Sequence, residues 1–99
     1  MNRKKSKHDQ YIDILVERLS PKYDVIYSNV EYAVNDMVIG EIDLLGVKGD
    51  NLDLYEVKCS GSFAKAKRQL RRAKGYADSR DYHINLYYYS GKENLLKVV

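Results

Sequence analysis

The sequence lacks several features that would place it outside the small globular proteins. It has no tryptophan, one proline and a single cysteine, Cys59. A lone cysteine cannot form an intramolecular disulfide, which favours a reducing, intracellular compartment. No apolar run approaches the roughly 20 residues that a membrane-spanning helix needs, and the basic first residues lack the apolar stretch of a signal peptide. We therefore expect an intracellular protein that does not associate with a membrane.

Two classes of functional site are also missing from the sequence. There is no cluster of cysteine and histidine, so we do not expect a zinc site. There is no glycine-rich phosphate loop, so we do not expect nucleotide hydrolysis. The 99 residues, of which 44% are hydrophobic, suffice for one domain with a modest core. We expect a single domain over residues 1–99, with residues 1–7 as a flexible basic tail.

The charged residues are unevenly distributed along the chain. Residues 1–8 carry four basic and no acidic side chains, whereas residues 9–58 hold 11 of the 14 acidic side chains. Residues 59–80 are again strongly basic. An acidic middle between two basic segments suits a cation site that lies beside a polyanion such as nucleic acid. Basic segments of this kind are also common as solvated surfaces.

The hydrophobic pattern predicts an α/β fold. Apolar residues recur at spacings of three and four over residues 9–20 and 63–79, which predicts two helices. Strands are expected over 23–33, 37–48, 52–59 and 82–89, with a short edge strand over 95–99. The turn composition Gly49-Asp50-Asn51 predicts a hairpin. The order α-β-β-β-α-β indicates a mixed central sheet flanked by helices.

Charged residues at two-residue spacing lie on each of the two strands of this hairpin. Glu41 and Asp43 are two apart in the run 40–45, and Glu56 and Lys58 are two apart on the next strand. Residues two apart on a strand point to one face, so three carboxylates and one ammonium can converge if the strands pair. The apolar residues between them, Ile42 with Leu44 and Tyr55 with Val57, are expected to face the other way. Clustered carboxylates repel unless a cation neutralises them, and Mg²⁺ accepts such ligands. Solvated acids on an outward strand face would show the same spacing.

The run Gly-Glu-Ile-Asp-Leu, a hairpin and then Glu-Val-Lys resembles the PD-(D/E)XK nuclease superfamily. The resemblance implies a restriction-endonuclease-like core and a metal-dependent deoxyribonuclease that uses Mg²⁺, with Mn²⁺ as a substitute. It implies that Asp43, Glu56 and the carbonyl of Val57 hold the metal and that Lys58 is the catalytic lysine. Glu41 would bind a second metal or lie just outside the metal's ligand shell. The sequence departs from the family name because no proline precedes Asp43.

The helix that follows also resembles this superfamily, since Gln69 lies within Lys-Arg-Gln-Leu-Arg-Arg-Ala. The resemblance implies that Gln69 forms a hydrogen bond near the catalytic site or contacts DNA. The short chain and basic N-terminus are similar to the archaeal and viral Holliday-junction resolvases, which act in DNA recombination and repair. Those proteins carry an acidic residue on the first helix that joins the metal site. Asp9 is the preferred candidate because Glu17 lies on the far side of the predicted helix from the apolar residues.

The expected function is a structure-specific DNA endonuclease that hydrolyses phosphodiester bonds. A junction is cut on two strands and one chain offers one site, so we expect a homodimer. Two alternatives fit the same residues: a non-catalytic nucleic-acid-binding module of the same fold, and a nuclease that acts on ends or single strands. Phosphate contacts are expected from the basic residues of the tail and of the second helix: Arg3, Lys4, Lys5, Lys7, Lys65, Lys67, Arg68, Arg71, Arg72 and Lys74.

Overall fold

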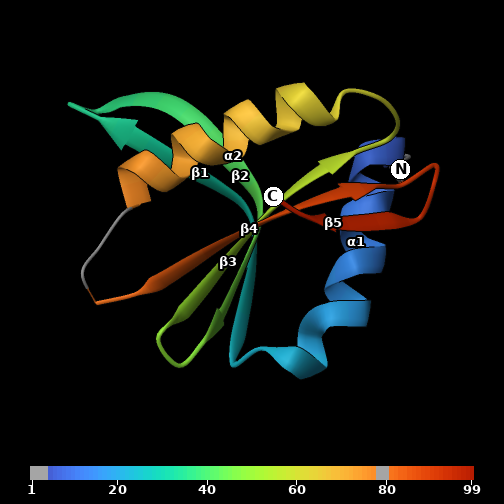
Figure 1. Ribbon diagram of the computed structural model, residues 1–99, viewed down its shortest axis with the longest axis horizontal. Coiled ribbons are helices and arrows are strands. Elements are labelled where there is room, and N and C mark those ends of the chain that lie inside the picture. The colour runs from blue at the N-terminus through green and yellow to red at the C-terminus, as the bar shows by residue number, and fades with distance from the viewer. Residues whose placement is uncertain (1–4, 78–80) are drawn as a thin grey trace, which may run out of the picture.

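The computed structural model shows a five-stranded mixed sheet with one helix on each face (Figure 1) and describes residues 5–77 and 81–99. Helix α1 and a 3₁₀ turn precede the first three strands, and helix α2 links β3 to β4. The strands lie in the order β1-β2-β3-β4-β5; β3 and β4 are parallel and the other neighbours antiparallel. The bounds are α1 Lys7–Leu19, η1 Ser20–Lys22, β1 Val25–Val34, β2 Met37–Lys48, β3 Asn51–Lys58, α2 Phe63–Ala77, β4 His83–Ser90 and β5 Leu95–Val98.

Two separate cores hold the layers together. Buried residues of α1 pack against one face of the sheet, which includes Tyr55 and Val57 of β3. Leu70 and Ala73 of α2 pack against the opposite face, which includes Leu54 of β3. Consecutive strand residues point to opposite faces, so this alternation along β3 places it between the two helices.

Both helices begin where the sequence offers a capping side chain. Ser6 precedes α1 and its side chain accepts a hydrogen bond from the backbone N–H of Asp9. Ser62 precedes α2 and its hydroxyl accepts from the backbone N–H of Lys65 at 3.1 Å. Such side-chain acceptors satisfy N–H groups that have no partner within the helix. Of the five residues in the apolar stripe expected on the second helix, Ala66, Leu70 and Ala73 are buried, whereas Phe63 and Ala77 at its two ends are half-buried.

The predicted elements are confirmed with small shifts of their bounds, and two details differ. The first helix begins at Lys7, so residues 5–7 lead into a capped helix instead of forming part of a flexible tail; residues 1–4 lie outside the described residues. A short 3₁₀ turn between α1 and β1 is absent from the expected order of elements. The short edge strand expected over 95–99 is confirmed, since β5 pairs with β4 at the edge of the sheet. No helix within the described residues is both long and apolar enough to cross a membrane.

Strand β2 is irregular near its middle. Ile42 packs in the core beneath α2, whereas Leu44 packs in the core beneath α1. The alternation expected from sequence placed these two side chains on one face, and the structure corrects it. Opposite this point on β1, Asn29 has a positive φ of 54° between the pairs Ser28↔Leu44 and Val30↔Ile42. Asp43 therefore occupies the position at which β2 turns its side chains from one face to the other.

Candidate functional site

The candidate site forms where strands β2 and β3 separate. Their ladder of paired residues ends at Leu44↔Tyr55, so Asp43 and Glu56 lie just beyond it. The backbone N–H of Val57 donates instead to the carboxylate Oδ2 of Asp43 at 2.8 Å. The side chain of Asp43 thus replaces the strand carbonyl as hydrogen-bond acceptor, which fixes the carboxylate beside β3.

The carboxyl groups of Asp43 and Glu56 are buried next to each other. Their residues are 6% and 7% exposed, respectively. The pKa of Glu56 is raised from 4.5 to about 7, first by burial and then by the negative charge of Asp43. A hydrogen bond shared with Asp43 raises it further, while the ammonium of Lys58 lowers it. Without an additional positive charge, a substantial fraction of Glu56 is therefore protonated at neutral pH.

Lys58 supplies the only ammonium group with an ion pair to these carboxylates within residues 5–77 and 81–99. Its Nζ lies 3.4 Å from Oε1 of Glu56, and its side chain is 23% exposed. The spacing of two residues on β3 brings both side chains to the same face, as expected from the sequence. The pair consists of a nearly buried carboxylate and a lysine that still reaches solvent.

A histidine of α1 completes the site, and the sequence analysis did not identify it. Nε2 of His8 lies 2.9 Å from the carbonyl oxygen of Val57 and 3.3 Å from Oδ2 of Asp43. A carbonyl oxygen only accepts hydrogen bonds, so Nε2 carries a proton and donates. Two of the three groups expected to hold a metal thus converge on a single donor atom. A lone histidine in a first helical turn gave no signal that could have revealed this contact.

The acidic candidates outside this pair do not contact it. Asp9 has a side chain that is 55% exposed and lies at 3.6 Å from Nδ1 of His8, so it reaches the site only through that ring. Glu17 is exposed on α1. Glu41 is exposed on β2 opposite Glu31 and is not among the groups that shift the pKa of Glu56. The structure brings two of the expected carboxylates together and leaves Glu41 and Asp9 apart.

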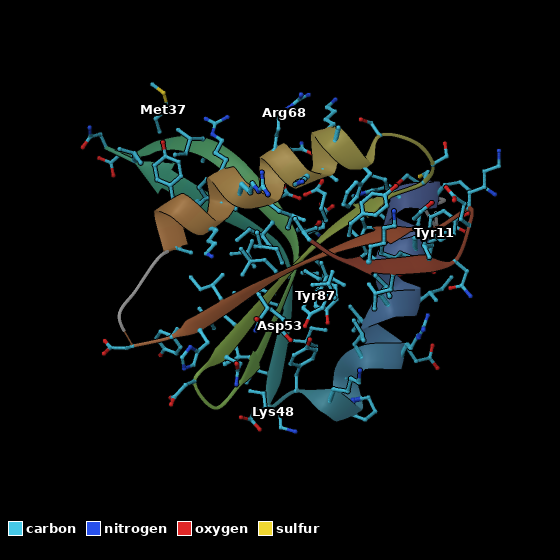
Figure 2. The ribbon with its side chains drawn as sticks, in the orientation of Figure 1. Tyr11, Met37, Lys48, Asp53, Arg68 and Tyr87 are labelled. Atoms are coloured by element: carbon cyan, nitrogen blue, oxygen red, sulfur yellow. The ribbon has the colours of Figure 1, made fainter. Side chains whose placement is uncertain are left out.

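The candidates on α2 lie on its outer surface. Gln69 is exposed and forms no hydrogen bond with the described part of the chain. Figure 2 shows Arg68 directed away from the sheet. The basic residues of α2 are Lys65, Lys67, Arg68, Arg71, Arg72 and Lys74. Lys67 is half-buried and the others are exposed. None of the six forms an ion pair with another described residue.

The basic residues before and within α1 differ from those of α2. Lys5 is exposed but pairs with Asp13, with Nζ at 2.5 Å from Oδ2, so part of its charge is neutralised. Lys7 is exposed in the first turn of α1. Arg3 and Lys4 lie outside the described residues. Among the helices and strands of the described chain, α2 therefore carries the largest group of basic side chains without an ion pair.

Comparison with known proteins adds no further constraint on this site. No family model, curated protein or solved structure matches the chain. Among the described residues, no three histidine, cysteine, aspartate or glutamate side chains form a group that could hold a metal ion. A metal at Asp43 and Glu56 would accordingly need backbone and water oxygens to complete its ligands.

Proposed function

We propose that the chain is a metal-dependent DNA endonuclease of the PD-(D/E)XK type with a restriction-endonuclease-like core. One observation carries the proposal: two buried carboxyl groups, Asp43 and Glu56, share a site with one ammonium and one backbone carbonyl. Burying like charges together is costly. A purely structural position would be better filled by apolar side chains, so the arrangement favours a site that binds a cation.

The donor set fits a hard divalent cation such as Mg²⁺ or Mn²⁺. Asp43 and Glu56 would hold it with carboxylate oxygens and Val57 with its carbonyl, which are oxygen ligands of the kind that Mg²⁺ accepts. When bound, such an ion makes water a better nucleophile and stabilises charge on phosphoryl oxygens. Val57 O and Asp43 Oδ2 both face the N–H of His8. These two oxygens therefore already accept from one hydrogen-bond donor, and withdrawal of the ring would free both.

The chain's own residues have separate tasks in this proposal. Lys58 remains partly exposed beside Glu56, where its ammonium can orient the attacking water and stabilise negative charge on the phosphate. The Val57 N–H holds the carboxylate of Asp43 in place. The outer face of α2 supplies unpaired cations for phosphate contacts, which give affinity without reading base sequence. Shape-selective cleavage of branched DNA by a homodimer fits this mode of binding.

The test compares cleavage of a labelled four-way junction and a matched linear duplex with Mg²⁺, Mn²⁺ or chelator. We expect metal-dependent cutting that Glu56→Gln and Lys58→Ala each reduce at least about 100-fold, the order of loss seen when one group that stabilises transition-state charge is removed. Asp50→Asn removes an exposed charge from the turn between β2 and β3, at the opposite end of the hairpin from the site, and serves as the control.

Three outcomes separate this proposal from its alternatives. Cleavage of junction over duplex would support the resolvase-like version, whereas cleavage restricted to ends or single strands would replace it with an exonuclease or single-strand nuclease. Salt-sensitive binding with no cutting in any metal would refute catalysis and support a binding module. Absence of nucleic-acid binding at low salt would refute both.

A further inference from the structure

A second polar site lies at the other end of β3. A cavity of about 400 Å³ opens on the face of the sheet that α1 covers only in part, near the 3₁₀ turn. Its walls include three tyrosines, from the segment after the turn, from β3 and from β4: Tyr23, Tyr55 and Tyr87. Asp53 of β3 also lines it, and Figure 2 shows Asp53 close to Tyr87. The cavity is large enough for a small ligand.

Hydrogen bonds organise the polar side of this cavity around one carboxylate. The hydroxyl of Tyr23 donates to Oδ2 of Asp53 at 2.6 Å, and Nδ2 of Asn85 donates to Oδ1 at 2.9 Å. The hydroxyls of Tyr23 and Tyr55 are also hydrogen-bonded to each other. Because the hydroxyl of Tyr23 donates its hydrogen bond to Asp53, the hydroxyl of Tyr55 is the donor in the contact between the two tyrosines. Burial, together with the hydrogen bond to Asp53, raises the pKa of Tyr23, so its hydroxyl stays protonated.

This network leaves acceptor capacity on the carboxylate. Each oxygen of Asp53 has accepted one hydrogen bond from the protein, and an ionised carboxylate offers about four acceptor positions. A ligand with N–H or NH₂ groups can use the remaining positions. The cavity thus selects a hydrogen-bond donor at this end.

Aromatic faces form the wall next to the carboxylate. The rings of Tyr55 and Tyr87 are stacked with centroids 4.9 Å apart and an interplanar angle of 18°. Tyr23 meets Tyr55 edge-on at 6.3 Å. Tyr55 is 3% exposed, whereas Tyr87 is half-buried and lines the cavity. A planar ring that enters the cavity can therefore extend the stack on Tyr87.

Two lysines give the rim a positive charge. Lys22 of the 3₁₀ turn and Lys48 at the end of β2 both line the cavity and are exposed. Neither forms an ion pair within the part of the chain that the structure describes. Free ammonium groups at the mouth attract phosphate and disfavour a cationic ligand.

We propose that this cavity binds a nucleoside monophosphate unit. The base stacks on Tyr87 and directs an amino group to Asp53, and the phosphate lies between Lys22 and Lys48. The unit comes either from a free nucleotide or from an unpaired residue of a nucleic acid. The site is distinct from the Asp43–Glu56 pair, because Asp53 and Tyr55 face α1 whereas Glu56 points to the other face of β3.

Calorimetric titration of the intact protein with AMP, GMP, CMP and UMP tests the proposal. Inorganic phosphate, ribose 5-phosphate and the free nucleosides serve as partial ligands. We expect saturable binding of at least one monophosphate, weakened about tenfold or more by Tyr87→Leu through loss of stacking. Lys48→Ala should weaken the monophosphate but not the nucleoside, and Asp53→Asn should weaken bases that carry an amino group most. Lys92→Ala is the matched surface control.

The outcomes distinguish both the source of the ligand and the fate of the nuclease proposal. Binding of an unstructured single-stranded oligonucleotide that Tyr87→Leu weakens, without binding of monophosphates, would assign the site to nucleic acid. The proposal would be overturned if inorganic phosphate bound as tightly as the monophosphates, or if none of these probes showed saturable binding. Because Lys48 is exposed, Lys48→Ala remains informative if Tyr87→Leu fails to fold. Glu56→Gln should bind nucleotide as tightly as the unsubstituted protein, because Glu56 lies outside the cavity. Nucleotide binding can therefore be measured whether or not the protein is a nuclease.

Discussion

Substitution of Glu56 by glutamine tests the electrostatics of the candidate metal site directly. The carboxyl of Glu56 has its pKa raised from 4.5 to about 7 in the folded chain. When folding raises the pKa of a carboxyl group, that group stabilises the folded state fully at pH values below its unfolded-state pKa. This stabilisation is lost as the pH rises through the folded-state pKa. The contribution is therefore complete below about pH 4.5 and is lost between there and about pH 7. The difference amounts to about 3 kcal/mol.

Glutamine has nearly the same shape but no charge to bury. Without metal at pH 8, we expect Glu56→Gln to be more stable than the unsubstituted protein by up to about 3 kcal/mol. Loss of the ion pair with Lys58 reduces this gain. At pH 4.5 the two proteins should differ little. Urea unfolding followed by circular dichroism at both pH values, with chelator present, measures the difference. Comparison at each pH cancels the titration of other groups.

Added Mg²⁺ extends this test to ligand binding. A cation that binds only the folded state raises its stability, so Mg²⁺ should stabilise the unsubstituted protein at pH 8 and have little effect on Glu56→Gln. Asp50→Asn, which removes an exposed carboxylate, should keep the full response to Mg²⁺. A Glu56→Gln protein that is destabilised equally at both pH values would refute the reasoning, because Glu56 would then not carry a buried, unfavourable charge.

Two further predictions follow from single contacts, and a third from the proposed homodimer. Asp43→Asn should keep an acceptor for the Val57 N–H, whereas Asp43→Ala leaves that group unpaired and should cost about 1–3 kcal/mol more in urea unfolding. Gly46→Ala would place its Cβ 2.6 Å from the ring of Tyr23 and should destabilise by about 1–3 kcal/mol, whereas Gly75→Ala meets no atom within 4 Å and should not destabilise; equal stability of these two would contradict the packing of Tyr23. Sedimentation equilibrium should give twice the chain mass of 11.5 kDa if the enzyme is a homodimer, and a monomer with and without DNA would argue against junction resolution.

The elements that sequence predicts well are those with a strong local pattern. The second helix was predicted from alanine and leucine at helical spacing, and Ala66, Leu70 and Ala73 are its buried residues. The hairpin followed from Gly49-Asp50-Asn51, and Gly49 adopts a positive φ of 54°. In both cases, residues close in sequence determine the conformation, so the pattern carries the necessary information.

The parts that sequence reasoning missed depend on contacts between distant segments. His8 meets Val57 across 49 residues, and no local pattern distinguishes it from a solvent-exposed histidine. The expectation that Ile42 and Leu44 share a face assumed regular alternation, which fails where β2 changes faces opposite Asn29. Regular alternation also placed Glu41 with Asp43, and the same irregularity leaves Glu41 exposed. The sequence thus identified the residue types of the site. It did not reveal the irregularity of β2, which determines which of these residues lie together.

The position of Asp43 explains why this break matters for a binding site. A regular antiparallel ladder would have continued past Leu44↔Tyr55 and satisfied the Val57 N–H with a strand carbonyl. The carboxylate accepts that hydrogen bond instead, so it cannot turn to solvent without leaving the N–H unpaired. Burial raises the pKa of Glu56, and the negative charge of Asp43, held in place beside it, raises that pKa further. Replacing such a buried polar pair by apolar residues is often stabilising, so selection for stability alone would not retain it in a domain of this size.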